Sequence, residues 1–91
     1  MSDLLSDVCR REGMSMRRDG NRWYAEAIHG TARLCLYAPS DLDSAEGWSY
    51  QVTNWLDGTV LAEGGGTLQE CWVALELAAE VRRKARRKAT P

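Results

Sequence analysis

The sequence contains no apolar run that approaches the roughly 20 residues needed for a membrane-spanning helix. Residues 1–13, MSDLLSDVCRREG, carry an acidic residue before any basic one and have no long apolar segment. This pattern does not match a secretion signal. The two absences predict a cytoplasmic protein.

Residue types that carry chemistry are scarce. The three cysteines, Cys9, Cys35 and Cys71, are odd in number and match no metal-ligand spacing, which favours reduced thiols. We place Cys9 and Cys71 in the core and expect Cys35 to face outward as the most reactive thiol. The single histidine, His29, precedes a glycine and is interpreted as a turn residue. A general base would need a placed nucleophile and an orienting partner, and the sequence offers neither.

The glycine run Gly64–Gly66 precedes a predicted helix but lacks the lysine of a phosphate-binding loop. The carboxylate of Glu70, in the first turn of that helix, would also repel a phosphate. We interpret the glycines as a corner between a strand and a helix. The sequence therefore predicts a protein that is not an enzyme and that holds no cofactor and no metal.

Charge is unevenly distributed along the 91 residues, whose formal net charge is −1. Residues 19–80 hold ten acidic residues against two basic ones, and residues 81–91 hold six basic residues and no acidic one. A chain of this size corresponds to one domain. We predict a single α+β domain over residues 1–81, followed by a basic helix end or tail over residues 82–91.

Helix signals stand at both ends of the domain. Ser2 or Asp3 can cap a first helix that stops at Gly13 and has one apolar stripe, formed by Leu4, Leu5, Val8 and Cys9. Residues 67–70 match the S/T-x-x-E capping box of a second helix. The apolar face of that helix contains Leu68, Cys71, Trp72, Leu75 and Ala79.

A meander of short strands is predicted between the helices. Asp19–Gly20 is typical of a two-residue hairpin turn and would pair Met16 with Trp23. His29–Gly30 would form a second turn and set Glu26 opposite Arg33, a favourable pair of charges.

A third hairpin turns near Asp57–Gly58 and places Leu61 on the same face as Val52. The predicted fold is α+β, with a four- to five-stranded antiparallel sheet and the N- and C-terminal helices packed on one face. The expected core consists of Leu5, Val8, Met16, Trp23, Leu34, Leu36, Trp48, Tyr50, Val52, Leu61, Leu68, Trp72 and Leu75.

Exposed aromatic residues and an acidic loop are the candidates for binding a protein partner. Tyr24 and Tyr37 are expected to lie diagonally across two strands on the solvent side, and Trp55 near the tip of the last hairpin. Such side chains often anchor protein interfaces. Together with the acidic residues of the loop before Trp48, the predicted partner-binding set is Trp55, Tyr24, Tyr37, Asp41, Asp43 and Glu46.

The basic tail offers an alternative function, which is binding of nucleic acid. Its six basic residues could neutralise several phosphates, and a second basic group lies at the first hairpin. The competing interpretation is a solvated helix end, where cations are favoured by the helix dipole. The residues concerned are Arg82, Arg83, Lys84, Arg86, Arg87, Lys88, Arg17 and Arg18.

Three apolar residues of the last helix, Val73, Leu77 and Val81, recur at intervals of four and lie outside its main apolar stripe. Something is expected to cover them. The candidates are the first helix, a partner protein, or a second copy of the chain in a homodimer.

The stretch WSYQVTNWLDGTVLAEGGGTLQECWVALELAAEV, residues 48–81, carries two resemblances. It resembles the hairpin-and-helix half of a double-stranded RNA-binding domain, which implies helices at both ends of a sheet. That family binds phosphates through lysines at the start of the helix, whereas this chain has Thr67, Leu68, Gln69 and Glu70 there.

The same stretch is similar to the W-x-Y/W-x-V…DG-x-V-x-A-x-G…A-x-x-x-A-A pattern of small proteins from bacteriophages and mobile elements, some of which resemble anti-CRISPR inhibitors. This resemblance implies the architecture and a phage-type inhibitor, but no site residues. Taken with the acidic body and the exposed aromatic residues, it leads us to predict a non-catalytic protein that occludes a host protein through an acidic and aromatic surface.

Overall fold

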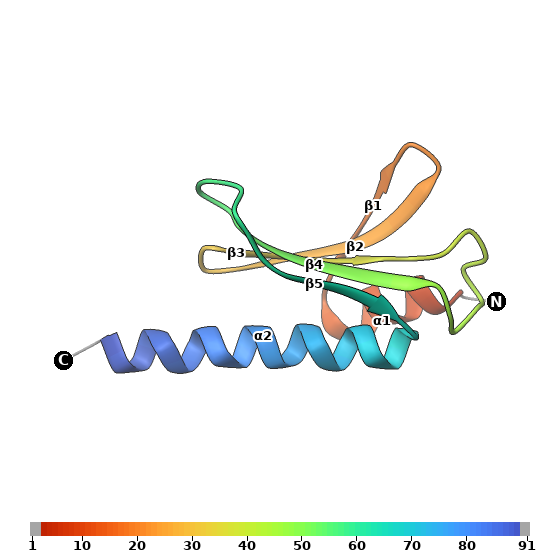
Figure 1. Ribbon diagram of the computed structural model, residues 1–91. Helices are drawn as coiled ribbons and strands as arrows, with labels where there is room; N and C mark the ends of the chain where they lie inside the picture. Colours follow the sequence, from red (N-terminus) through yellow and green to blue (C-terminus); the bar gives the residue numbers. More distant parts are fainter. Residues whose placement is uncertain (1–2, 90–91) are drawn as a thin grey trace.

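The computed structural model describes residues 3–89, and the side chains of residues 3–79. The fold is α+β and consists of a five-stranded antiparallel sheet with a helix at each end of the chain, as the sequence predicts (Figure 1). Its elements are α1 (Leu4–Glu12), β1 (Ser15–Asp19), β2 (Arg22–His29), β3 (Ala32–Tyr37), β4 (Trp48–Asn54), β5 (Val60–Gly66) and α2 (Leu68–Ala89).

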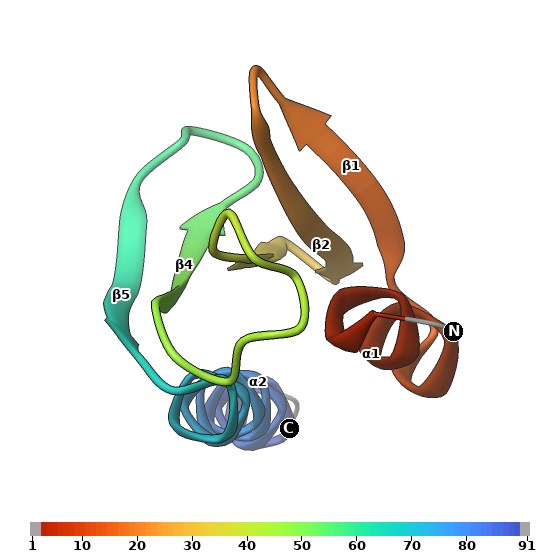
Figure 2. The same ribbon diagram turned by 90° about the vertical axis from the view of Figure 1, so that its right-hand side faces the viewer.

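The sheet has the order β1-β2-β3-β4-β5, so each strand pairs with its neighbour in sequence. Helix α1 packs against β1 and β2, and α2 packs against β3, β4 and β5. Both helices lie on one face, which we call the inner face. On the opposite, outer face the β1–β2 hairpin and the tip of the β4–β5 hairpin both rise away from α2 (Figures 1 and 2). None of the described helices is long and apolar enough to cross a bilayer.

Helix α1 begins and ends where its capping residues predict. The Ser6 N–H donates to Asp3 Oδ1 at 2.7 Å, which satisfies one of the free amides of the first turn. Gly13 ends the helix with φ +68°, a conformation that costs glycine little. The buried residues Leu5, Val8 and Cys9 form the predicted stripe.

Helix α2 begins with the predicted capping box. The Glu70 N–H donates to Thr67 Oγ1 at 3.1 Å, and the Thr67 N–H donates to Glu70 Oε1 at 3.0 Å. The hydrogen bond from the Thr67 backbone is the main cause that lowers the pKa of Glu70 below its ordinary value. Local side-chain chemistry therefore defines this strand-to-helix corner.

The registers predicted for the first two hairpins are wrong by two residues. Met16 pairs with Ala25 instead of Trp23, and the turn residues are Gly20 and Asn21. The glycine thus occupies the first turn position with φ +61°, and no described non-glycine residue adopts a positive φ. Asp19 would have needed a positive φ in the predicted turn.

The second hairpin shifts in the same way. Gly30 takes the first turn position with φ +64°, and His29 becomes the last residue of β2, opposite Ala32. Cys35 lies opposite Glu26 where Arg33 was expected, yet Arg33 still reaches Glu26 diagonally, with Nη2 and Oε2 2.6 Å apart. A shift of two residues preserves the face of every side chain, so the predicted inner face survives.

The core lies between the inner face and the two helices. Most predicted members are buried or packed against it, but Met16 and Leu61 are exposed. Met16 lies on the edge strand β1, all of whose residues are exposed. A β-bulge between Val52 and Thr53 leaves Ala62 opposite Val52, so Ala62 shares the face of Val52 where Leu61 was expected.

Met14 replaces Met16 as the methionine of the core, since their side chains are 9% and 38% exposed. Met14→Ala is expected to lower the free energy of unfolding by about 2–5 kcal/mol through lost packing. Met16→Ala should change it by only about 0.5 kcal/mol. Urea denaturation followed by circular dichroism checks the pair, and equal effects would contradict this placement of β1.

Candidate protein-binding surface

The tip of the β4–β5 hairpin is a loop held by five hydrogen bonds. The Leu56 N–H donates to Asn54 Oδ1 and the Thr59 N–H to Asp57 Oδ1, each at 2.8 Å. Backbone bonds join Asn54 with Thr59 and Gly58 with Asn54, also at 2.8 Å. The fifth bond ties the loop to the neighbouring turn, because the Trp55 N–H donates to the Thr31 carbonyl at 2.6 Å.

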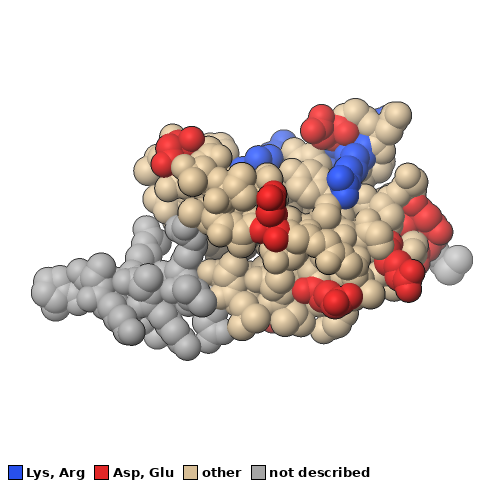
Figure 3. Space-filling model, in the orientation of Figure 1, with Lys and Arg blue, Asp and Glu red and all other residues tan. Residues whose placement is uncertain are grey.

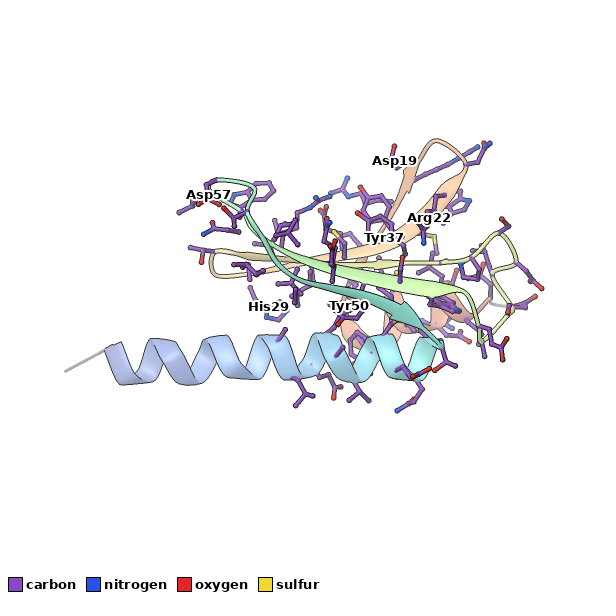
Figure 4. All side chains as sticks on the ribbon, in the orientation of Figure 1. Asp19, Arg22, His29, Tyr37, Tyr50 and Asp57 are labelled. Atoms are coloured by element: carbon purple, nitrogen blue, oxygen red, sulfur yellow. The ribbon has the colours of Figure 1, made fainter. Side chains whose placement is uncertain are left out.

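The bonds from Thr59 to Asp57 also explain why the pKa of Asp57 lies below its ordinary value. Asn54 and Asp57 are short polar residues that commonly hold turns by accepting from the backbone two residues on. The sequence therefore builds a defined loop at this tip (Figure 4).

This ordered loop displays apolar side chains to solvent. Trp55 is 56% exposed and Leu56 is 78% exposed, and Val60 and Leu61 at the start of β5 are exposed as well. We call these four residues the tip cluster. The sequence predicted the exposure of Trp55 but missed Leu56 and Val60. A Trp-Leu pair directly before Asp-Gly in a turn was the signal that could have found Leu56.

Tyr24 and Tyr37 lie on the outer face as expected, directly opposite each other instead of diagonally. Their ring centroids are 5.1 Å apart. The Arg22 guanidinium lies 5.0 Å from the centroid of the Tyr37 ring and donates to Ser49 Oγ at 2.6 Å (Figure 4). Both tyrosines are half-buried, so their contacts are largely with the sheet itself.

The outer face also covers Cys35, which corrects the expectation that this thiol is the most reactive. Cys35 is buried among the outer-face side chains, close to Tyr37 and to the Arg33–Glu26 ion pair. Burial raises the pKa of the Cys35 thiol. Burial is likewise the main cause of the raised pKa of Cys9 and of Cys71. All three thiols are therefore protonated near neutral pH.

The acidic loop lies far from the tip cluster. Asp41, Asp43 and Glu46 are exposed in the connection that leads into Trp48, whereas Trp55 follows the last residue of β4. The length of β4 separates the two groups by roughly 20 Å at about 3.3 Å per residue. The six predicted partner-binding residues thus belong to three places: the tip, the outer face and the acidic loop at the opposite end.

The remaining predicted sites are placed only in part. Val73 and Leu77 are exposed on α2, so α1 does not cover them, and coverage by a partner or a second copy stays a prediction. The side chain of Val81 lies outside the described residues. The same holds for the basic side chains of the tail, Arg82, Arg83, Lys84, Arg86, Arg87 and Lys88.

The two arginines of β1 that were assigned to nucleic acid are exposed but have partners within the chain. Arg18 Nε donates to the Gly20 carbonyl at 2.7 Å, and its guanidinium lies 5.5 Å from the centroid of the Trp23 ring. Arg17 Nε lies 3.8 Å from Glu26 Oε1. Neither arginine is held in place by burial.

A pocket of about 220 Å³ lies on the inner face between the end of α1 and α2. Sequence reasoning missed it because its walls come from both helices and from β2 and β3. His29 lines it and points toward the α2 side of the sheet (Figure 4). Its other lining residues are Glu12, Met14, Ala27, Leu34, Trp72, Leu75, Glu76 and Ala79. Within residues 3–79, no three His, Cys, Asp or Glu side chains gather as a metal site would require.

Comparison with known proteins adds no relative: no family model, no curated protein and no solved structure matches this chain. The candidate surfaces are therefore ranked by their own geometry.

Proposed function

We propose that this chain is a non-catalytic binding protein that contacts a partner protein through the tip cluster. The observation that carries the proposal is the exposure of Trp55 and Leu56 on a loop that hydrogen bonds hold in shape. Tryptophan is among the residues that contribute most to binding energy at protein interfaces.

The order of the loop supports this assignment. A partner that binds a loop already held by its own hydrogen bonds loses less conformational entropy than one that must order a loose segment. The bond from Trp55 to Thr31 adds the β2–β3 turn to the same rigid unit. The tip cluster alone is smaller than the ~800 Å² that each side of a typical interface buries, so neighbouring surface must also contribute.

The charge of the acidic loop favours a partner protein that has a basic surface. Asp41, Asp43 and Glu46 stand at the other end of the sheet, where they can attract and orient such a partner without touching the tip contact. The excess of acidic over basic residues in positions 19–80 supports occlusion of a basic cleft on a host protein, as a phage-type inhibitor would achieve it.

The proposal is tested with the double variant Trp55→Ala, Leu56→Ser in an affinity pull-down from bacterial lysate treated with nuclease. Wild type should retain a discrete protein, and the double variant should lose most of it because the apolar contact is gone. Met16→Ser is the control, since Met16 is also an exposed apolar residue but lies on β1, at the opposite edge of the sheet. Equal retention by all three proteins, or no retained protein, contradicts the proposal.

The bounds of α2 favour nucleic-acid binding as a second candidate. The helix continues to Ala89 and therefore carries all six basic residues of the tail on a helical backbone. An untreated half of the same lysate tests this function. Nucleic acid recovered by wild type and lost on removal of residues 82–91 would support it over the tip cluster.

A further inference from the structure

The open sheet has two edge strands, β1 and β5, which differ in how well they are protected against the addition of another strand. An edge strand presents unpaired N–H and C=O groups to which another chain can add a strand. Natural proteins protect such edges with charged side chains, prolines or very short strands.

Strand β1 carries this protection. It has five residues, and Arg17, Arg18 and Asp19 give it three charges in succession. Helix α1 also packs against it. A further strand could add to β1 only beside this run of charges.

Strand β5 lacks comparable protection. Its sequence, VLAEGGG, has one charged residue, Glu63, and no lysine or proline. A Cβ on Gly64 would come within 2.8 Å of the Tyr50 ring, and one on Gly65 within 3.2 Å of the Trp48 carbonyl oxygen. Close packing against β4 thus favours glycine at both positions, and the glycines leave backbone exposed along the free edge.

The paired part of β5 is regular enough to act as a template. Residues 62–66 pair without interruption with residues 48–52 of β4, and the bulge lies beyond them, toward the tip. Leu61 and Val60 are exposed immediately next to this stretch. A strand added along β5 would therefore run from the glycines toward the tip cluster and continue into it.

The charge around this edge indicates the chemistry of the added strand. Figure 3 looks onto the side of the molecule that carries β5, and there the surface over β5 is largely uncharged with isolated acidic side chains. Lysine and arginine side chains appear in this view only above β5, toward the outer face. Glu63 lies at the middle of the strand, exposed, with one hydrogen bond from Gln51 at 3.3 Å.

A second copy of the chain fits this edge poorly. Symmetric antiparallel pairing of residues 60–66 with the same residues of another copy would set Glu63 against Glu63, and like charges directly opposite each other destabilise a strand pair. A basic residue opposite Glu63 would be favoured instead.

We infer that β5 binds an extended segment of the partner protein as a sixth strand, with a lysine or arginine opposite Glu63 and apolar residues beside Leu61. This inference rests on the proposed function, because it identifies the part of the partner that reaches the surface next to the tip cluster. Backbone hydrogen bonds supply affinity in this mode of recognition, and the side chains supply specificity.

The probe is a displayed library of linear 12-residue peptides, selected against the full chain. Enriched peptides are expected to alternate β-branched or aromatic residues with polar ones and to contain a lysine or arginine. Glu63→Lys should weaken their binding roughly tenfold, and replacing the basic residue of the peptide with glutamate should restore it. Asp19→Lys, which likewise replaces a negative charge by a positive one but lies on the opposite edge strand β1, should leave binding unchanged.

Amide hydrogen exchange gives the second measurement. A bound peptide should slow exchange of backbone amides within residues 60–66, because the free edge becomes hydrogen-bonded. Failure to enrich any peptide, peptides indifferent to Glu63→Lys, or protection confined to other strands would overturn the inference.

The outcomes separate the inference from the proposed function. A lysate protein whose retention depends on Trp55 and Leu56 but not on Glu63 supports the tip contact and overturns the sixth strand. If peptides bind β5 but no lysate protein depends on Trp55 and Leu56 for its retention, the sixth strand is supported and the contact through the tip cluster is overturned.

Discussion

Replacing Trp48 with alanine is expected to lower the free energy of unfolding by about 3–5 kcal/mol. Trp48 is 1% exposed and has the largest side chain among the fully buried residues. Trp48 is the first residue of β4 and pairs with Gly66, the last residue of β5 before α2. Its removal should therefore leave a cavity in the core next to the connection between β5 and α2. Its Nε1–H also donates to the Ser44 carbonyl at 2.7 Å, and the variant removes this partner.

Urea denaturation followed by far-ultraviolet circular dichroism measures this loss without relying on tryptophan fluorescence. Trp55→Ala is the control, because it removes the same side chain from an exposed position and should change stability by only about 0.5 kcal/mol. A Trp48→Ala protein that unfolds at the same urea concentration as the Trp55→Ala protein would contradict the buried placement of Trp48.

Leu36→Ala is expected to cost about 2–5 kcal/mol. Leu36 is fully buried on β3, the central strand, between Ala25 on β2 and Tyr50 on β4. Alanine at position 25 is too small to fill the space that the leucine side chain leaves, so the cavity should persist. Cavities that cannot collapse are the more expensive ones.

The matched control for this variant is Leu56→Ala, which truncates a leucine at the exposed tip. Both proteins should retain the circular dichroism spectrum of the parent at low temperature, while only Leu36→Ala shifts the urea midpoint. A parent-like midpoint for Leu36→Ala would mean that the β2–β3–β4 register described above is incorrect.

Local signals made the start of both helices and the end of α1 predictable from the sequence. The caps at Asp3 and Gly13 and the box at Thr67 and Glu70 depend on residues within four positions of each other. Alternation also gave the correct inner face for β1 to β4, even with hairpin registers that were wrong by two residues, since the side-chain period is two.

Features that depend on distant neighbours were not predictable in the same way. The exposure of Leu61 follows from a bulge opposite β4, and the burial of Cys35 follows from side chains on β2 and β3. Trp72 lies on the predicted apolar stripe but is only half-buried, because it borders the pocket between the helices and donates to Glu76 Oε1 at 2.6 Å. The spacing of apolar residues along a helix does not show where the contact between the helix and the sheet ends.

The exposure of Trp55 and of the acidic loop was predicted from the sequence, but how far apart the two lie was not recognised. Trp55 follows a strand and precedes Asp57–Gly58, so its exposure follows from the turn. The acidic loop and the tip stand at opposite ends of β4, and the strand boundaries alone would have separated them. The hydrogen bond from Trp55 to Thr31 joins two turns that are 24 residues apart in the sequence, and no local sequence pattern predicts it.

The burial of all three cysteines has a practical consequence. With Cys9, Cys35 and Cys71 enclosed and protonated, the native fold presents no ready thiolate to a maleimide reagent. A single cysteine introduced at Leu56 or at Glu63 would then carry a fluorophore or spin label selectively, without removal of the natural thiols. The wild-type chain is thus already a suitable background for spectroscopy at both surfaces.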